Sequence, residues 1–232
     1  MSTKPQKKNN PSEPSVLGKS YLIAYNGVQT LGWSYLLLQT ATYFLNRGTL
    51  DNYWNEVKWT IIIFQNAAIL EILHAAIRLV PSNVFVVFMQ IFSRVFLVCG
   101  ILMVTDSAIV SPGLPLCVLA WSITEILRYS YYAFNLLNMV PQVLLFLRYS
   151  TFLVLYPLGI TGELLCMYHS LNEIAEKQLF TISMPNKWNF IFNYYYILIF
   201  YMLLYIPIFP YLFGHMLKQR KKMLADDKKK SL

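Results

Sequence analysis

The chain has 232 residues, of which 56% are hydrophobic and only 13% are charged, and its mean hydropathy is +0.46. Soluble domains usually carry about 25% charged residues, so the composition excludes an ordinary soluble globular protein and predicts a polytopic membrane protein. The formal net charge of +8 comes mostly from the two ends of the chain. We interpret this charge as a signal of membrane orientation and expect no nucleic-acid partner.

Taken in order, the chain begins with a polar segment that contains proline and lysine, residues 1–20, which lacks the apolar core and cleavage site of a signal peptide. We predict a disordered cytosolic tail there, a membrane domain over residues 21–213, and a basic cytosolic tail over residues 214–232. The membrane domain contains six predicted spans, at about 21–45, 58–79, 84–105, 114–134, 143–168 and 188–213.

The length of these apolar runs predicts helices, because strands of a membrane barrel would alternate in polarity over about ten residues. The expected fold class is therefore all-α, with six transmembrane helices in one bundle. Lysine and arginine gather on the side that holds both ends of the chain, which predicts that both termini are cytosolic. The final residues, KKSL, are similar to a dilysine signal for retrieval to the endoplasmic reticulum.

Several charged residues lie inside the predicted spans, where they are costly and therefore candidates for function. The fourth span carries a stripe at helical spacing, Trp121, Glu125, Arg128 and Tyr132, and further charges are Glu71, Arg94 and Arg148. One interpretation is that these charges pair between helices and hold the bundle together. The other is that they contact a substrate, and the pattern alone leaves both open.

The fifth span contains Tyr149, Tyr156 and Glu163 at intervals of seven residues, which would place all three on one helical face. Pro157 and Gly159 loosen the backbone between them. A tyrosine hydroxyl and a desolvated carboxylate suit proton transfer without a cofactor. The alternative is that Glu163 only pairs with an arginine and that Tyr156 only packs.

The three cysteines, Cys99, Cys117 and Cys166, have neither metal-site nor disulfide spacing, and we interpret them as small buried hydrophobic residues. None is followed six residues later by arginine, so the phosphatase signature Cys-x5-Arg is absent. No metal site is expected.

Four blocks carry a family resemblance: "AAILEILHAAIRLV", "WSITEILRYSYYAF", "LRYSTFLVLYPLGITGELL" and "MPNKWNF". They resemble the very-long-chain (3R)-3-hydroxyacyl-CoA dehydratase family, once called protein-tyrosine-phosphatase-like. The resemblance implies a six-span lyase of the endoplasmic reticulum membrane that removes water from 3-hydroxyacyl-CoA to form trans-2-enoyl-CoA in fatty-acid elongation. It needs no cofactor, and other elongation-cycle enzymes are expected partners.

The resemblance also implies the catalytic residues, because the family pattern Tyr-Pro-x-Gly-Ile-Thr-x-Glu falls on Tyr156 and Glu163. Gly162 departs from the serine that is common there. Which of the pair is acid and which is base stays open. Supporting or substrate-binding roles are expected for a larger set: Tyr149, Arg148, Arg94, Glu125 and Arg128. The alternatives to an enzyme are a non-catalytic scaffold of the elongation machinery and a transporter.

Overall fold

The computed structural model describes residues 15–183 and 191–230, and nearly all of this part is helical. Its elements are α1 (Val16–Asn46), α2 (Tyr53–Ala67), α3 (Leu70–Ala76), α4 (Val84–Leu97), the π-helical turn η1 (Val98–Leu102), α5 (Asp106–Ile109), α6 (Gly113–Leu136), α7 (Gln142–Arg148), α8 (Phe152–Lys177), β1 (Ile182–Ser183), β2 (Ile191–Phe192) and α9 (Tyr194–Lys230). The expected helical architecture is confirmed. The sequence did not predict the short antiparallel ladder, in which Ile182 lies opposite Phe192.

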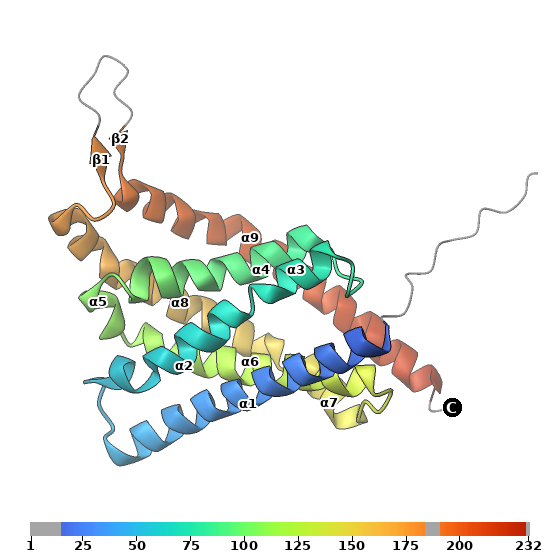
Figure 1. Cartoon of the computed structure of the whole chain (residues 1–232). Helices are drawn as coiled ribbons and strands as arrows, with labels where there is room; N and C mark the ends of the chain where they lie inside the picture. Colours follow the sequence, from blue (N-terminus) through green and yellow to red (C-terminus); the bar gives the residue numbers. More distant parts are fainter. Residues whose placement is uncertain (1–14, 184–190, 231–232) are drawn as a thin grey trace, which may run out of the picture.

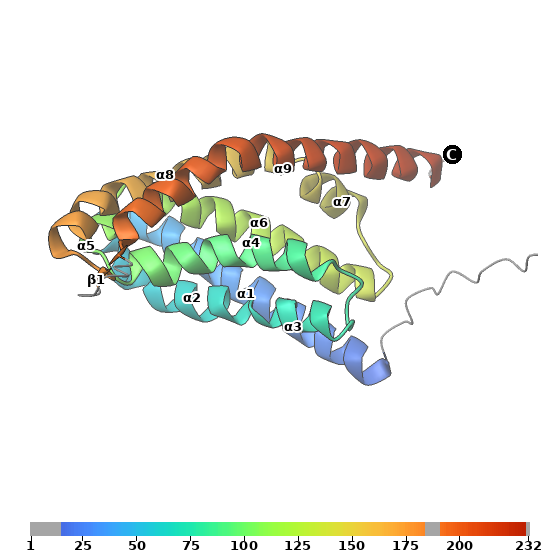
Figure 2. The same ribbon diagram turned by 90° about the horizontal axis from the view of Figure 1, so that it is seen from above.

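The long helices lie side by side along one axis of the molecule (Figures 1 and 2). Helix α6 packs against both α1 and α8, and its buried residues include Trp121 and Tyr129. The start of α1, the helix α7 and the end of α9 lie at one end of the bundle, and the β ladder lies at the other end (Figure 1). The two ends of the described chain are therefore on the same side.

Four helical segments are long and apolar enough to cross a membrane, namely Tyr53–Ala76, Val84–Leu102, Phe152–Lys177 and Tyr194–Met223. Many large apolar side chains on these segments point outward, such as Trp59, Phe85 and Phe200, which are 66%, 69% and 62% exposed. Outward apolar side chains are what a helix bundle needs in lipid. The apolar composition and the structure therefore agree in indicating a membrane protein.

Three predicted boundaries differ from the structure. Helix α1 already begins at Val16, and α9 continues to Lys230, so the helices extend into both segments expected to be tails. Residues 1–14 and the last two residues of the KKSL signal lie outside the described residues. The predicted fifth span is two helices, α7 and α8, separated by a turn over residues 149–151. In this turn the Ser150 N–H donates to the Leu147 carbonyl at 3.1 Å, a bond over three residues in place of the four of an α-helix.

Candidate active site

Glu163 lies in the middle of α8, with only 6% of its surface exposed, and faces two other helices. The indole Nε1 of Trp121, on α6, donates to its Oε1 at 2.9 Å. The hydroxyl of Tyr205, on α9, donates to its Oε2 at 2.8 Å. Each carboxylate oxygen therefore has a donor from a different helix. Such bonds fix the orientation of the carboxylate.

Tyr156 lies on α8 seven residues before Glu163, so the two share a face with a rise of about 10 Å between them. Its ring stacks on Phe209 of α9, with centroids 5.2 Å apart and planes at 8°, and Phe213 lies beyond it at 6.2 Å. Among the residues that the structure describes, its hydroxyl has no hydrogen-bond partner. The ring is held in place while the hydroxyl stays available to another molecule. Pro157 does not break α8, which runs unbroken from Phe152 to Lys177.

The glycine that departs from the family pattern lies at the closest contact between α6 and α8. A Cβ on Gly162 would lie 2.6 Å from the backbone nitrogen of Cys117 and 2.7 Å from the carbonyl oxygen of Gly113. A Cβ on Gly113 would lie 2.4 Å from the Gly162 carbonyl oxygen. Small residues let membrane helices approach at such distances. Gly162 thus brings Glu163 and Trp121 close enough to bond, and it needs no hydroxyl to do so.

A network of charged side chains lies near Glu163 and Trp121, and it includes Arg94, Glu125 and Arg128. Arg94 pairs with Glu125, whose side chain is 3% exposed. Arg128 donates through Nε to Glu125 at 2.7 Å and through Nη1 and Nη2 to Glu71 at 2.5 and 2.9 Å. The network joins α3, α4 and α6, as the interpretation of interhelical pairing expected. It reaches the site through Trp121, because the Arg94 guanidinium lies 5.7 Å from the centre of its ring.

Arg148 and Tyr149 belong neither to the Tyr156–Glu163 pair nor to the charge network. The expectation that Tyr149 shares a helical face with Tyr156 was wrong, because Tyr149 lies in the turn between α7 and α8. Its ring instead packs near Arg148, whose guanidinium carbon lies 5.6 Å from its centre. Both residues lie at the C-terminal end of α7, at the end of the bundle that holds this helix (Figure 1), whereas Glu163 lies in the middle of α8.

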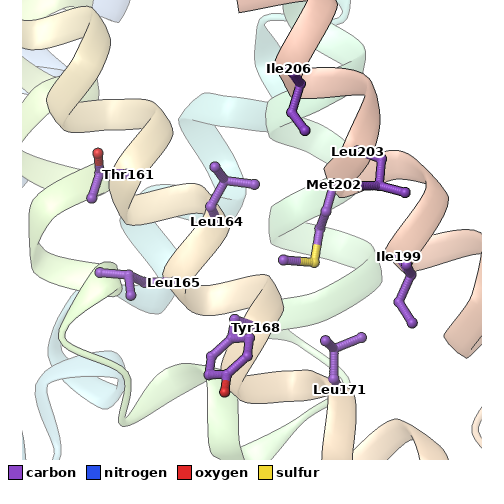
Figure 3. A pocket seen from close by; sticks show the side chains of 9 residues that line it. All are labelled: Thr161, Leu164, Leu165, Tyr168, Leu171, Ile199, Met202, Leu203 and Ile206. Atoms are coloured by element: carbon purple, nitrogen blue, oxygen red, sulfur yellow. The ribbon is translucent and has the colours of Figure 1, made fainter.

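A groove of about 520 Å³ separates α8 from α9 on another side of α8 (Figure 3). Glu163 points toward Trp121 on α6 and Tyr205 on α9, whereas Leu165, two residues on, lines the groove, because successive residues of a helix are about 100° apart. The lining is apolar apart from Thr161 and Tyr168 and consists of Thr161, Leu164, Leu165, Tyr168, Leu171, Ile199, Met202, Leu203 and Ile206. The groove offers an apolar surface with no group suited to catalysis.

Sequence reasoning missed both donors to Glu163. Trp121 had been placed in the stripe on the fourth span, but its partner was not identified, and Tyr205 had no distinguishing pattern among 17 tyrosines. Cys117 and Cys166 are buried as expected, whereas Cys99, in η1, is exposed, and its Sγ donates to Asn66 Oδ1 of α2 at 3.6 Å. Within the described residues, no group of three or more histidine, cysteine or acidic residues is placed to hold a metal ion.

The fold and the site together define a class: a helical protein of membrane character with a buried, doubly hydrogen-bonded carboxylate and a tyrosine on one helix face. Comparison with known families identifies it further. The family model described as "Protein tyrosine phosphatase-like protein, PTPLA" matches residues 65–226. The chain therefore belongs to this family. The block "MPNKWNF" that supported the resemblance, residues 184–190, lies outside the described residues.

Curated relatives match almost the whole chain. The Caenorhabditis elegans protein named very-long-chain (3R)-3-hydroxyacyl-CoA dehydratase hpo-8 is 46% identical over 213 residues, which cover 91% of this chain and 98% of the relative. The human dehydratase 2 of the same name is 43% identical over 209 residues, covering 90% and 82%. The rice dehydratase PASTICCINO 2A is 40% identical over 218 residues, covering 92% and 97%. No solved structure matches the chain.

Proposed function

We propose that this protein dehydrates (3R)-3-hydroxyacyl-CoA to trans-2-enoyl-CoA in the elongation of very-long-chain fatty acids. The observation that carries the proposal is the pair on α8. Glu163 is a buried carboxylate oriented by two donors, and Tyr156 lies on the same face with an uncommitted hydroxyl. The relatives named as dehydratases of this substrate support the assignment.

Elimination of water requires a base at C2 and an acid at the C3 hydroxyl. Glu163 takes the C2 proton, which the thioester carbonyl makes acidic, and the electron pair of the C–H bond forms the C2–C3 double bond. The C3–O bond breaks while Tyr156 protonates the departing hydroxide, so that water leaves. The proton on Glu163 then returns to Tyr156, and the enzyme is restored. We assign the base to Glu163 because both of its carboxylate oxygens accept hydrogen bonds, so that the group is arranged to accept a proton and not to donate one.

The reaction is redox-neutral: Tyr156 supplies the proton that leaves in water, and Glu163 takes up the proton from C2. The two bonds from α6 and α9 to Glu163 hold its carboxylate in a fixed orientation, so that the base is already positioned when the substrate binds. The acyl chain lies against the apolar groove between α8 and α9, where its methylene groups replace lipid at little cost.

For the membrane topology, we propose six spans with both termini in the cytosol, in the endoplasmic reticulum membrane. The four candidate spans run alongside α1 and α6 (Figure 1). These two helices have 31 and 24 residues. At 1.5 Å per residue they measure about 46 and 36 Å, enough to cross a hydrocarbon core of about 30 Å. Both helices carry buried polar residues, among them Gln29 in α1 and Glu125 in α6, and such residues lower the mean hydropathy on which a composition criterion depends.

Other enzymes of the elongation cycle are proposed as partners, because the reaction takes over a membrane-held intermediate from one enzyme and passes its product to another. A very-long acyl chain is poorly soluble in water, so direct contact between successive enzymes favours its transfer.

The test is a dehydration assay with purified full-length protein in neutral detergent. The unmodified protein is expected to convert a long-chain (3R)-3-hydroxyacyl-CoA to the enoyl product, whose conjugated thioester absorbs in the ultraviolet. Glu163→Gln and Tyr156→Phe are each expected to lower kcat by about 10² or more, the range of general acid–base catalysis. Folded variants that keep full rates would refute the assignment of the pair.

A further inference from the structure

Arg148, at the end of α7, is a cation enclosed by aromatic rings. Its guanidinium carbon lies 4.3 Å from the ring centre of Tyr131, 4.7 Å from that of Tyr132 and 5.6 Å from that of Tyr149. Its Nη2 donates to the Tyr132 hydroxyl at 3.3 Å, and its Nη1 donates to the Arg128 carbonyl at 3.4 Å. Cation–π contacts of this kind hold a guanidinium without neutralising it.

Arg148 differs in this respect from the other arginines of the bundle interior. Arg94 and Arg128 pair with carboxylates, but within the described side chains no carboxylate pairs with Arg148. Its Nε is buried and has no hydrogen-bond partner there. A buried N–H without a partner costs free energy, so an acceptor from another molecule would stabilise it.

A second arginine reaches the same turn from α9. The Nε of Arg220 lies 3.4 Å from the hydroxyl oxygen of Ser150, two residues after Arg148. Helix α7 lies beside the C-terminal part of α9 (Figure 2). No described carboxylate pairs with Arg220 either, and the neighbouring Lys218, Lys221 and Lys222 are exposed. The two arginines thus flank one turn at the end of the bundle, where the described side chains supply no carboxylate to either of them.

This turn and Glu163 lie at two ends of the contact between α8 and α9. Tyr205 bonds Glu163, and Arg220 bonds Ser150 in the turn. These two residues of α9 are 15 positions apart, which corresponds to a rise of about 22 Å along the helix. The Tyr156–Phe209 stack lies between the two ends. An extended pantetheine arm has a comparable reach. A thioester beside Tyr156 and Glu163 would therefore have the phosphate groups of its carrier near the turn.

We propose that Arg148 and Arg220 bind phosphate groups of the substrate's CoA moiety, an inference that rests on the proposed function. A guanidinium offers paired N–H donors that match phosphate oxygens. The rings around Arg148 hold its donors in place before the ligand arrives, which reduces the ordering cost of binding. A lipid headgroup also carries phosphate at this depth, so the test separates the two sources.

The experiment compares two substrates with the same acyl chain, the 3-hydroxyacyl-CoA and the 3-hydroxyacyl-pantetheine thioester, which has no phosphate. Full-length protein is assayed in neutral detergent without anionic lipid. Arg148→Gln and Arg220→Gln are expected to raise KM for the CoA thioester about tenfold each, the effect of losing one charged hydrogen bond. KM for the pantetheine thioester and kcat for both are expected to stay unchanged. Arg47 directly follows the C-terminal end of α1, at the opposite end of the bundle from the turn between α7 and α8. Arg47→Gln is therefore the matched control and should leave KM and kcat unchanged for both thioesters.

Each other outcome has a definite meaning. Equal losses with both thioesters would show that the arginines only maintain the fold, and would overturn the inference. An effect of Arg220→Gln that appears only with vesicles containing anionic lipid would assign the site to a headgroup and also overturn it. Arg220→Gln decides the question if Arg148→Gln does not fold. An unmodified protein inactive toward both thioesters would refute the proposed function itself, and this inference with it.

Discussion

The hydroxyl of Tyr205 is the more easily tested of the two donors to Glu163, because Tyr205→Phe removes a single atom and leaves the ring. That hydroxyl lies 2.8 Å from Oε2 of a carboxylate that is 6% exposed. A hydrogen bond to a charged group contributes about 1.5–3 kcal/mol, and about 1.4 kcal/mol corresponds to a factor of ten in rate. We therefore expect kcat to fall roughly ten- to a hundredfold.

KM is expected to change little, because Tyr205 orients the base and does not hold the acyl-CoA. The assay is steady-state dehydration of a long-chain (3R)-3-hydroxyacyl-CoA. The matched control is Tyr196→Phe, on the same helix, whose side chain is 67% exposed. This control should retain the kcat of the unmodified protein.

A double-mutant cycle makes the interpretation sharper. In a Glu163→Gln background, Tyr205→Phe should cause little further loss, because the carboxylate that it orients is already gone. Independent, additive losses would show that Tyr205 acts elsewhere. A Tyr205→Phe enzyme with unchanged kcat and KM would refute the reasoning that the bond positions Glu163.

Three further predictions test the structure around the site. Gly162→Ser overpacks the α6–α8 contact and should lower the free energy of unfolding by about 1–3 kcal/mol, which is measured as a lower Tm in detergent. The control is Gly27→Ala, whose new Cβ has no atom within 4 Å and which should leave Tm unchanged. Glu125→Gln leaves Arg94 without its charged partner and should lower the free energy of unfolding by about 3 kcal/mol. Glu56 is exposed, so Glu56→Gln should leave stability unchanged. Equal Tm values for the two variants would contradict a stabilising role of the charge network. Met202→Trp fills the groove and should lower kcat/KM for the longest acyl chains more than for short ones; a uniform loss would argue against acyl binding there.

Much of the architecture was accessible from sequence because it depends on local periodicity. Runs of apolar residues predicted helices, and an interval of seven residues placed Tyr156 and Glu163 on one face of the later-described α8. The same periodicity was misleading for Tyr149, because a turn over residues 149–151 separates α7 from α8. The break is a change of backbone hydrogen bonding over a few residues, which residue spacing does not report.

The sequence by itself determined which residue types enter the membrane domain and which of them share a helical face. Only the tertiary structure decided what each of them contacts. Trp121 and Tyr205 are each 42 residues from Glu163 along the chain, and they meet it because the contact at Gly113 and Gly162 sets the spacing of α6 and α8 while α9 folds back along α8. Likewise, Arg128 found two carboxylates and Arg148 found three tyrosine rings. Contacts between distant segments depend on how whole helices pack, and that packing is a property of the complete bundle.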